Sequence, residues 1–191
     1  MPHLLPLFVT LAGRRVVLVG GGPVAAAKLQ QLLPTGADLV VVAPEICEAI
    51  AKTERATFRI VRRRFVPGDL DDAWLAVAAA TPRVNRDVAR AAEARRVFVN
   101  AVDDPANATA FLSGVVRREG ITIAISTDGV APALTSLLRQ ALDAVLPTDL
   151  RLWVAKARNL RVEWRREGTP IAERRPLLLQ ALNDLYGDSP R

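Results

Sequence analysis

Continuous apolar runs alternate with helix-like segments through the first hundred residues. An unbroken run of β-branched and leucine side chains ends at Val19, three glycines follow at positions 20–22, and small residues then open a helix that continues to about residue 33. Further apolar runs lie at 38–43, 56–61, 74–79 and 97–102, and an alanine-rich helical segment at 84–94 precedes the last of them. The strands of a parallel sheet covered on both faces form such continuous runs. The pattern therefore predicts an α/β domain built on a parallel sheet.

The glycine turn after the first strand matches the pattern Gly-x-Gly-x-x-Ala of dinucleotide-binding folds. Gly20 permits the tight turn, Gly22 lets the backbone approach a pyrophosphate, and Ala25 allows the helix to pack closely on the strand. The first amide N–H groups of a helix have no partner within it, so they and the helix dipole favour an anionic ligand. The turn therefore predicts a nucleotide site in a Rossmann-like sheet. A glycine turn in another kind of parallel α/β protein is the alternative.

Two loops after later strands complete the expected cofactor site. Glu45, just beyond the second strand, is the nearest candidate for the acid that binds the ribose hydroxyls in such folds. No basic residue adjoins Glu45 in the sequence to receive a 2′-phosphate, which favours NAD over NADP. Ala80 lies in the small, close-turning segment after the fourth strand, where a loop lining the cofactor is expected.

Asp103 is the candidate catalytic base. It follows the apolar run at 97–102, and in open parallel sheets the ligand crevice lies beyond the carboxyl ends of the strands. We therefore expect Asp103 to face the same side of the sheet as the glycine turn. The alternative is a purely structural turn, which the sequence Asp103-Asp104-Pro105 also favours.

The pattern changes after residue 108. Two apolar segments, 110–117 and 121–126, flank a turn at 118–120, which predicts a β-hairpin instead of another strand–helix–strand unit. Pro132 suits the first position of the helix that follows, and one face of that helix is apolar. The apolar face consists of Leu134, Leu137, Leu138, Ala141, Leu142 and Val145. Because a hairpin and helix added to a finished sheet must bury their apolar faces, we expect a partner subunit and a homodimer.

The last part of the chain has no strand pattern. Its apolar residues recur at spacings of three and four, which predicts a helix over about 150–164, and a further helix follows over about 172–185. The fold class is therefore α/β, with three expected domains: a Rossmann-like nucleotide domain at 1–109, a dimerisation hairpin and helix at 110–147, and a small helical domain at 148–191.

Composition narrows the class of protein and of ligand. No apolar run approaches the ~20 residues of a membrane span, and the N-terminus lacks the pattern of a signal peptide, so we expect a cytoplasmic protein that binds no membrane. A single cysteine, Cys47, and a single histidine, His3, exclude an internal disulfide and favour no metal site. The formal net charge of +6 suits a polyanionic partner, which is a nucleic acid, an acidic lipid surface or a small molecule with many carboxylates.

Four segments together resemble the precorrin-2 dehydrogenase family, which includes the dehydrogenase and ferrochelatase module of siroheme synthase. These segments are 19–25 with Lys28, 42–45, 100–105 and 124–134. The resemblance implies that Asp103 is the catalytic aspartate. It implies NAD contacts at Gly22, Pro23, Val24, Pro44 and Glu45, and a substrate pocket that includes Asn100, Thr109, Ser126 and Thr127. Ala110 and Ser113 depart from the family pattern at the edge of that pocket.

The resemblance also implies an activity and partners. These are NAD-dependent oxidation of precorrin-2 to sirohydrochlorin, on the way to siroheme or cobalamin, in a homodimer. Precorrin-2 resembles other uroporphyrin-type rings in its eight carboxylates, which suits the basic charge. Ferrochelatase activity, with ferrous iron as a substrate, stays open, and no methyltransferase domain is expected.

Two other functions are weighed against this one. An NAD-dependent dehydrogenase of another substrate is disfavoured where that chemistry needs a histidine base, because the chain has none beyond His3. A redox-sensing NAD-binding regulator would need an element that reads nucleic acid, and the basic helix near the C-terminus has too many packed aromatic residues to serve well. We therefore expect no nucleic-acid partner.

Overall fold

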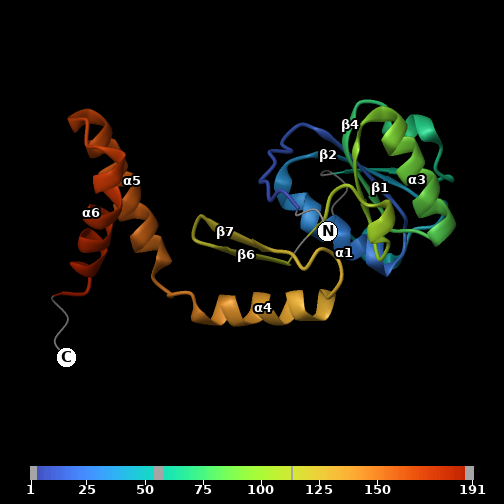
Figure 1. Cartoon of the computed structure of the whole chain (residues 1–191). Coiled ribbons are helices and arrows are strands. Elements are labelled where there is room, and N and C mark those ends of the chain that lie inside the picture. Colours follow the sequence, from blue (N-terminus) through green and yellow to red (C-terminus); the bar gives the residue numbers. More distant parts are fainter. Residues whose placement is uncertain (1–3, 54–57, 113, 188–191) are drawn as a thin grey trace. The chain divides into compact units, whose positions relative to one another are not determined.

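The computed structural model describes residues 4–53, 58–112 and 114–187, and its first unit is built on a five-stranded parallel sheet. The strands lie in the order β3-β2-β1-β4-β5 (Figure 1). Their bounds are β1 (Arg15–Val19), β2 (Asp38–Val42), β3 (Phe58–Val61), β4 (Ala73–Ala78) and β5 (Phe98–Ala101). The predicted parallel sheet is therefore confirmed, while the first two residues of the expected third strand lie outside the described residues. Strand order reverses between β1 and β4, where open α/β sheets bind ligands.

Helices cover both faces of this sheet (Figure 1). Helix α1 (Pro23–Leu32) packs through Ala25 and Leu29 on one apolar cluster, and α3 (Pro82–Arg95) packs through Val88 and Ala92 on the other. The remaining short elements are α2 (Glu48–Ala51) and the 3-10 turns η1 (Leu33–Thr35), η3 (Pro67–Leu70) and η4 (Pro105–Asn107). Both faces of the central strands are buried, which explains their unbroken apolar sequences.

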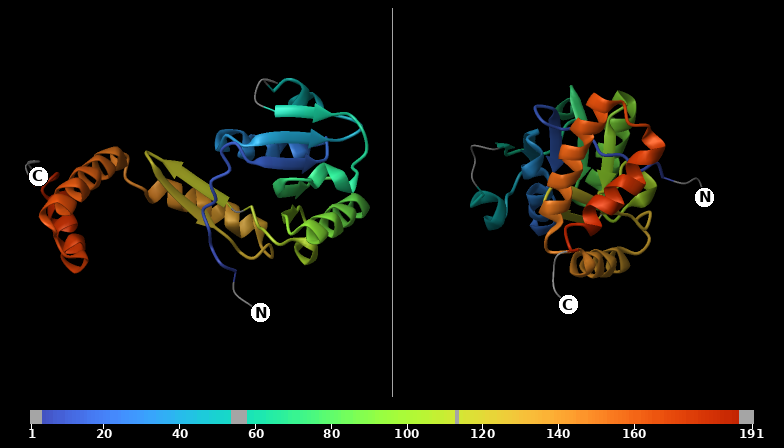
Figure 2. Two further views of the ribbon diagram at one scale, coloured as in Figure 1. Left: turned by 90° about the horizontal axis from the view of Figure 1, so that it is seen from above. Right: turned by 90° about the vertical axis from the view of Figure 1, so that its left-hand side faces the viewer.

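The second unit begins with the predicted hairpin and helix. Strands β6 (Gly114–Arg118) and β7 (Ile121–Ile125) pair antiparallel, and α4 (Pro132–Val145) packs along them (Figure 2). Glu119 and Gly120 form a two-residue turn with positive φ at both positions, as tight hairpins require. The first strand was predicted to start at Ala110 but starts at Gly114. The cause is that the N–H groups of Thr109 and Ala110 both donate to the Val99 carbonyl, at 2.8 and 2.9 Å.

Two helices follow in the same unit, α5 (Leu150–Glu167) and α6 (Ile171–Asn183) (Figure 2). The Trp153 indole donates to the Tyr186 hydroxyl, which donates to Asp149, so the end of the second helix is tied to the start of the first. The chain divides into two compact units, of which the first comprises residues 1–112 and 128–131 and the second comprises 113–127 and 132–191. The three predicted domains with their boundaries stay a prediction.

Candidate functional site

The glycine turn is held between the ends of two neighbouring strands. Gly20 has φ of +134°, and its N–H donates to the Val42 carbonyl at 3.0 Å. A side chain on Gly20 would collide with the Ala79 carbonyl, and one on Gly21 would collide with the Glu45 carbonyl. Both glycines are therefore required by close backbone packing. The sequence pattern assigned no role to Gly21.

Gly22 differs from the two glycines before it. It has an ordinary extended conformation, with φ of −84°, and no atom lies within 4 Å of a Cβ placed on it. No side chain caps the helix that follows, whose first residue is Pro23. The first amides of α1 and the open space above Gly22 therefore fit a pyrophosphate group. Val24 is exposed beside that space, whereas Ala25 is fully buried and acts through packing.

Pro44 and Glu45 follow β2 and are both exposed at the same edge of the sheet. Strand β3 pairs with β2, and Arg62 directly follows β3, so a basic residue follows the strand next to the one that precedes Glu45. The pairing continues past the strands, since the Ala43 N–H donates to the Val61 carbonyl at 3.2 Å. The carboxyl ends of the neighbouring strands β2 and β3 are therefore followed by an acid and by an arginine that are distant in sequence.

The guanidinium of the next residue, Arg63, already pairs with an acid. Its guanidinium donates to both carboxylate oxygens of Asp69, and the Val66 N–H donates to the same carboxylate at 2.9 Å. Burial raises the pKa of Asp69, but the bonds from Arg63 and Val66 outweigh burial and lower that pKa below its usual value. Arg63 therefore supports the local loop, whereas Arg62, which directly follows β3, is exposed.

The loop after β4 is held by a buried asparagine. The Ala80 N–H donates to Asn85 Oδ1 at 3.0 Å, and Asn85 on α3 is only 4% exposed. The Ala79 N–H donates to the Val19 carbonyl at 2.8 Å, which keeps this loop beside the glycine turn. Sequence reasoning placed Ala80 at the cofactor but missed Asn85, whose signal is an amide side chain in the first turn of the next helix.

Asp103 lies at the carboxyl end of β5, as predicted, and has a left-handed backbone with φ of +57°. The Val102 N–H donates to the Ala78 carbonyl at 3.0 Å, so the backbone before Asp103 is anchored to β4. Aspartate is among the few residues that tolerate this conformation, and such strain is often found at functional sites. Asp104 instead accepts a bond from the Asn107 amide at 2.8 Å, which is a turn role.

Asn100 and Thr109 join β5 to the segment that follows it. The Val99 N–H donates to Thr109 Oγ1 at 2.9 Å, and Asn100 Nδ2 donates to the Ala110 carbonyl at 3.0 Å. Asn100 is 7% exposed, and its Oδ1 has no hydrogen-bond partner among the described residues. Both side chains therefore hold the edge of the sheet, and their contacts with substrate stay a prediction.

Lys28 on α1 is half-buried. Burial lowers its pKa below the usual value, and the negative charge of Asp103 opposes that shift by raising the pKa. The structure therefore places a cation within electrostatic reach of the candidate base. In the sequence, Lys28 stands in a segment that matches the family but has no role assigned to it.

Ser126 and Thr127 belong to the second unit and follow β7. The hydroxyl groups of Thr127 and Thr135 form a hydrogen bond of 2.9 Å. The tetrapyrrole contacts expected of Ser126 and Thr127 stay a prediction. The next four residues belong to the first unit, where a side chain added to Gly129 would lie 3.3 Å from the Phe111 ring.

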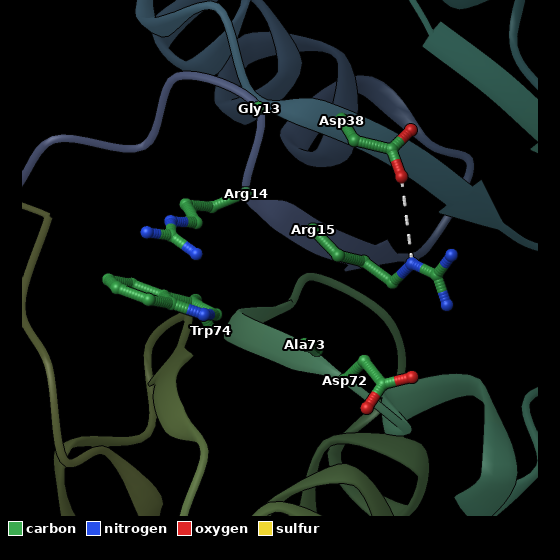
Figure 3. Close-up of a pocket in the computed structure, with 7 residues that line it drawn as sticks. All are labelled: Gly13, Arg14, Arg15, Asp38, Asp72, Ala73 and Trp74. Carbon is green, nitrogen blue, oxygen red and sulfur yellow. Dashed lines mark ion pairs between the residues drawn. The ribbon is translucent and has the colours of Figure 1, made fainter.

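A shallow pocket of about 440 Å³ lies at the opposite, amino end of the strands (Figure 3). The Arg14 guanidinium lies over the Trp74 ring, 4.1 Å from its centroid, and Arg15 Nε lies 3.6 Å from Asp38 Oδ2. The lining residues are Gly13, Arg14, Arg15, Asp38, Asp72, Ala73 and Trp74. Because both arginines already have partners and the pocket is far from the glycine turn in the sheet, we do not assign it to the reaction.

The described residues contain neither a metal cluster nor a membrane-spanning helix. No group of three or more His, Cys, Asp or Glu side chains among them is arranged to hold a metal ion. None of the described helices is both long and apolar enough to cross a membrane. Cys47 is a half-buried free cysteine, and His3 lies outside the described residues.

Comparison with known proteins gives consistent matches. A family model described as "Putative NAD(P)-binding" matches residues 7–114. "Siroheme synthase 2" of Klebsiella pneumoniae is 37% identical over 179 residues, which cover 92% of this chain and 38% of that protein. "Siroheme synthase" of Photorhabdus laumondii is 38% identical over 184 residues, which cover 95% of this chain and 39% of that protein. The chain thus spans about two fifths of the length of these relatives.

A solved structure matches nearly the whole chain. "SirC, precorrin-2 dehydrogenase" aligns with a TM-score of 0.73 at 25% sequence identity, over 96% of this chain and 92% of that one. The match covers both the parallel sheet with its glycine turn and the hairpin and helices that follow. The resemblance predicted from the motifs is thus confirmed, and the chain belongs to the family of putative NAD(P)-binding proteins defined over residues 7–114.

Proposed function

We propose that this protein oxidises precorrin-2 to sirohydrochlorin with NAD as the oxidant. The observation that carries the proposal is that the glycine turn and Asp103 lie at the same edge of one sheet, at or next to its switch point. The names of the similar proteins, siroheme synthase and precorrin-2 dehydrogenase, support this choice of substrate.

In this proposal some residues bind the cofactor and one residue accepts a proton. NAD, when bound, accepts a hydride from a ring carbon of the substrate. The open backbone at Gly22 and the first amides of α1 bind the pyrophosphate, and Asn85 holds the Ala80 loop against the cofactor. Asp103 accepts the proton that leaves a ring nitrogen, so that two electrons and two protons depart from the substrate. The fold contributes alignment of ring and cofactor.

NAD, not NADP, is the proposed cofactor. The exposed Glu45 carboxylate suits the two free ribose hydroxyls and repels a 2′-phosphate. Arg62 at the end of β3 acts in the opposite direction, because its cation attracts a phosphate. The proposal gives Glu45 the larger effect, since it directly follows β2, the strand that neighbours the glycine turn.

The active form is proposed to be a homodimer formed through α4. The hairpin contacts the polar side of this helix: Arg118 pairs with Asp143 at 2.7 Å, and a side chain on Gly114 would meet Thr135. The leucine face is left uncovered, with Leu137 62% and Val145 80% exposed in the single chain. A second copy supplies the apolar surface that this face lacks.

Other expected properties also stay proposals. We propose that the protein is cytoplasmic and has no nucleic-acid partner. Ferrous iron as a second substrate is a prediction in which Asp103 would take pyrrole protons. The alternatives, a regulator or a dehydrogenase of another substrate, make no use of the tetrapyrrole.

Anaerobic incubation of the purified protein with precorrin-2 and NAD tests the function. We expect the absorbance spectrum of sirohydrochlorin to appear together with NADH, and no product without NAD. Ferrous iron added afterwards tests for siroheme formation in the same cuvette. Binding of NAD without any oxidation of precorrin-2 would instead support the regulator or another substrate.

A further inference from the structure

Lys28 is a half-buried cation without a bonded partner. Among the described residues it makes no hydrogen bond and no ion pair, whereas exposed Lys52 pairs with Glu48 at 2.6 Å. Burial penalises the ammonium, which is why its pKa is lowered. A cation kept in such a place without a protein partner favours an anionic ligand.

The position of Lys28 on α1 directs its side chain toward the carboxyl edge of the sheet. It lies one turn after Val24 and Ala25, next to the buried face of the helix. Side chains on a helix lean toward its N-terminus, which here begins at the glycine turn. Lys28 therefore extends over the turn of α1 that borders the cofactor site.

Lys28 also lies on the side of the site that holds Asp103. Val102 and Ala110 pack against the same apolar cluster as the buried residues of α1, and Asp103 directly follows Val102. The charge of Asp103 acts on Lys28, yet the two groups do not form an ion pair.

A second polar group near this place also lacks a partner. Asn100 donates to the Ala110 carbonyl, but its buried Oδ1 accepts no bond within the described part of the chain. Asn100, three residues before Asp103, thus has a buried acceptor without a partner, and Lys28, whose charge interacts with that of Asp103, is a half-buried cation without an ion pair. Unsatisfied polar groups of this kind are uncommon in native proteins and are often found at ligand sites.

We propose that Lys28 binds one of the substrate's carboxylates beside Asp103 and is a recognition residue separate from the cofactor-binding turn. The proposal rests on the proposed function, in which the ligand carries eight carboxylates. A charge-assisted bond from the ammonium to one carboxylate fixes the rotation of the ring, and this rotation decides which nitrogen faces Asp103.

The test compares Lys28→Met with Lys52→Met, which removes an exposed lysine, and with Lys28→Arg, which keeps the charge. We expect Lys28→Met to raise the KM for precorrin-2 by about 10- to 100-fold, as loss of one charge-assisted bond predicts. The value of kcat should change less, the dissociation constant of NAD by calorimetry should stay the same, and Lys28→Arg should recover much of the loss. Lys52→Met should match the wild type.

Binding of uroporphyrin, an octacarboxylate that is not oxidised, gives a readout that does not need turnover. We expect weaker binding to Lys28→Met, measured by tryptophan fluorescence, and normal binding to Lys52→Met.

Unchanged KM and unchanged uroporphyrin binding overturn the proposal. Weaker NAD binding assigns Lys28 to the cofactor, and a loss of kcat alone makes it a positioning residue for Asp103. If the wild type binds uroporphyrin through Lys28 but does not oxidise precorrin-2, the proposed dehydrogenase function is wrong, whereas the proposed role of Lys28 in binding carboxylates still holds.

Discussion

At the scale of single residues, two adjacent glycines have different reasons to be glycine. Gly22 has room for a side chain and an extended backbone, so Gly22→Val should fold normally and fill the space proposed for the pyrophosphate. We expect NAD affinity by calorimetry to fall by at least about tenfold, since the lost contacts are charge-assisted.

Gly21→Ala is the matched comparison. Its new methyl group would meet the Glu45 carbonyl, which is backbone and cannot rotate away. We expect the free energy of unfolding, measured in urea, to fall by about 1–3 kcal/mol because of overpacking. The assignment of these two roles fails if Gly22→Val unfolds while Gly21→Ala is as stable as the wild type.

Asp103→Asn is the sharpest test of the proposed base. Asparagine matches aspartate in size and also tolerates the left-handed backbone at this position, so the fold should be kept. Loss of the proton acceptor should lower kcat by about 100- to 10,000-fold while NAD affinity stays the same. Asp104→Asn is the control, because that side chain bonds Asn107 within the turn. If both variants have the same activity, Asp103 is not the base and has only a structural role in the turn.

The proposed preference for NAD over NADP depends on the opposite charges of Glu45 and Arg62. Glu45→Gln should reduce the ratio of kcat/KM for NAD to that for NADP, because the repulsion of the 2′-phosphate is removed while Arg62 stays. Arg62→Gln should change the ratio in the opposite direction. Steady-state rates with each cofactor measure both effects, and a ratio that neither substitution changes would place the ribose elsewhere.

At the scale of elements, the loop after β4 depends on one residue of α3. Asn85→Ala leaves the Ala80 N–H without its partner, and loss of one such hydrogen bond costs about 0.5–1.5 kcal/mol of stability. We expect a lower free energy of unfolding together with a higher KM for NAD. Asn85→Asp keeps the acceptor oxygen and should restore most of both values. If Asn85→Asp has the same raised KM for NAD as Asn85→Ala, this hydrogen bond does not explain the effect on NAD binding.

At the scale of the whole molecule, the uncovered face of α4 predicts assembly. Leu138→Asp places a charge within the leucine face and should convert a dimer to monomers at micromolar concentration, measured by sedimentation. Gln140→Asp adds the same charge to an exposed position outside that face and should leave the dimer intact. A wild type that sediments as a monomer would contradict the proposed interface.

Much of the fold could be predicted because it depends on local patterns. The apolar run into Gly20 marks a strand that is buried on both faces, and Pro132 with the leucine stripe marks the start and face of α4. The same holds for Asp103, because any residue that follows a parallel strand lies at the carboxyl edge of the sheet. These conclusions needed no knowledge of which strands are neighbours.

The contacts that complete the site depend on strand order and packing. Arg62 follows the strand next to β2 because β3 pairs with β2, and Asn85 holds Ala80 because α3 folds back on β4. Lys28 is near the charge of Asp103 because Val102, just after β5, packs against the apolar cluster that holds the buried residues of α1. Spacing along a chain describes the faces of each element but does not state which elements adjoin. That information arises only when the sheet forms and buries both its faces at once.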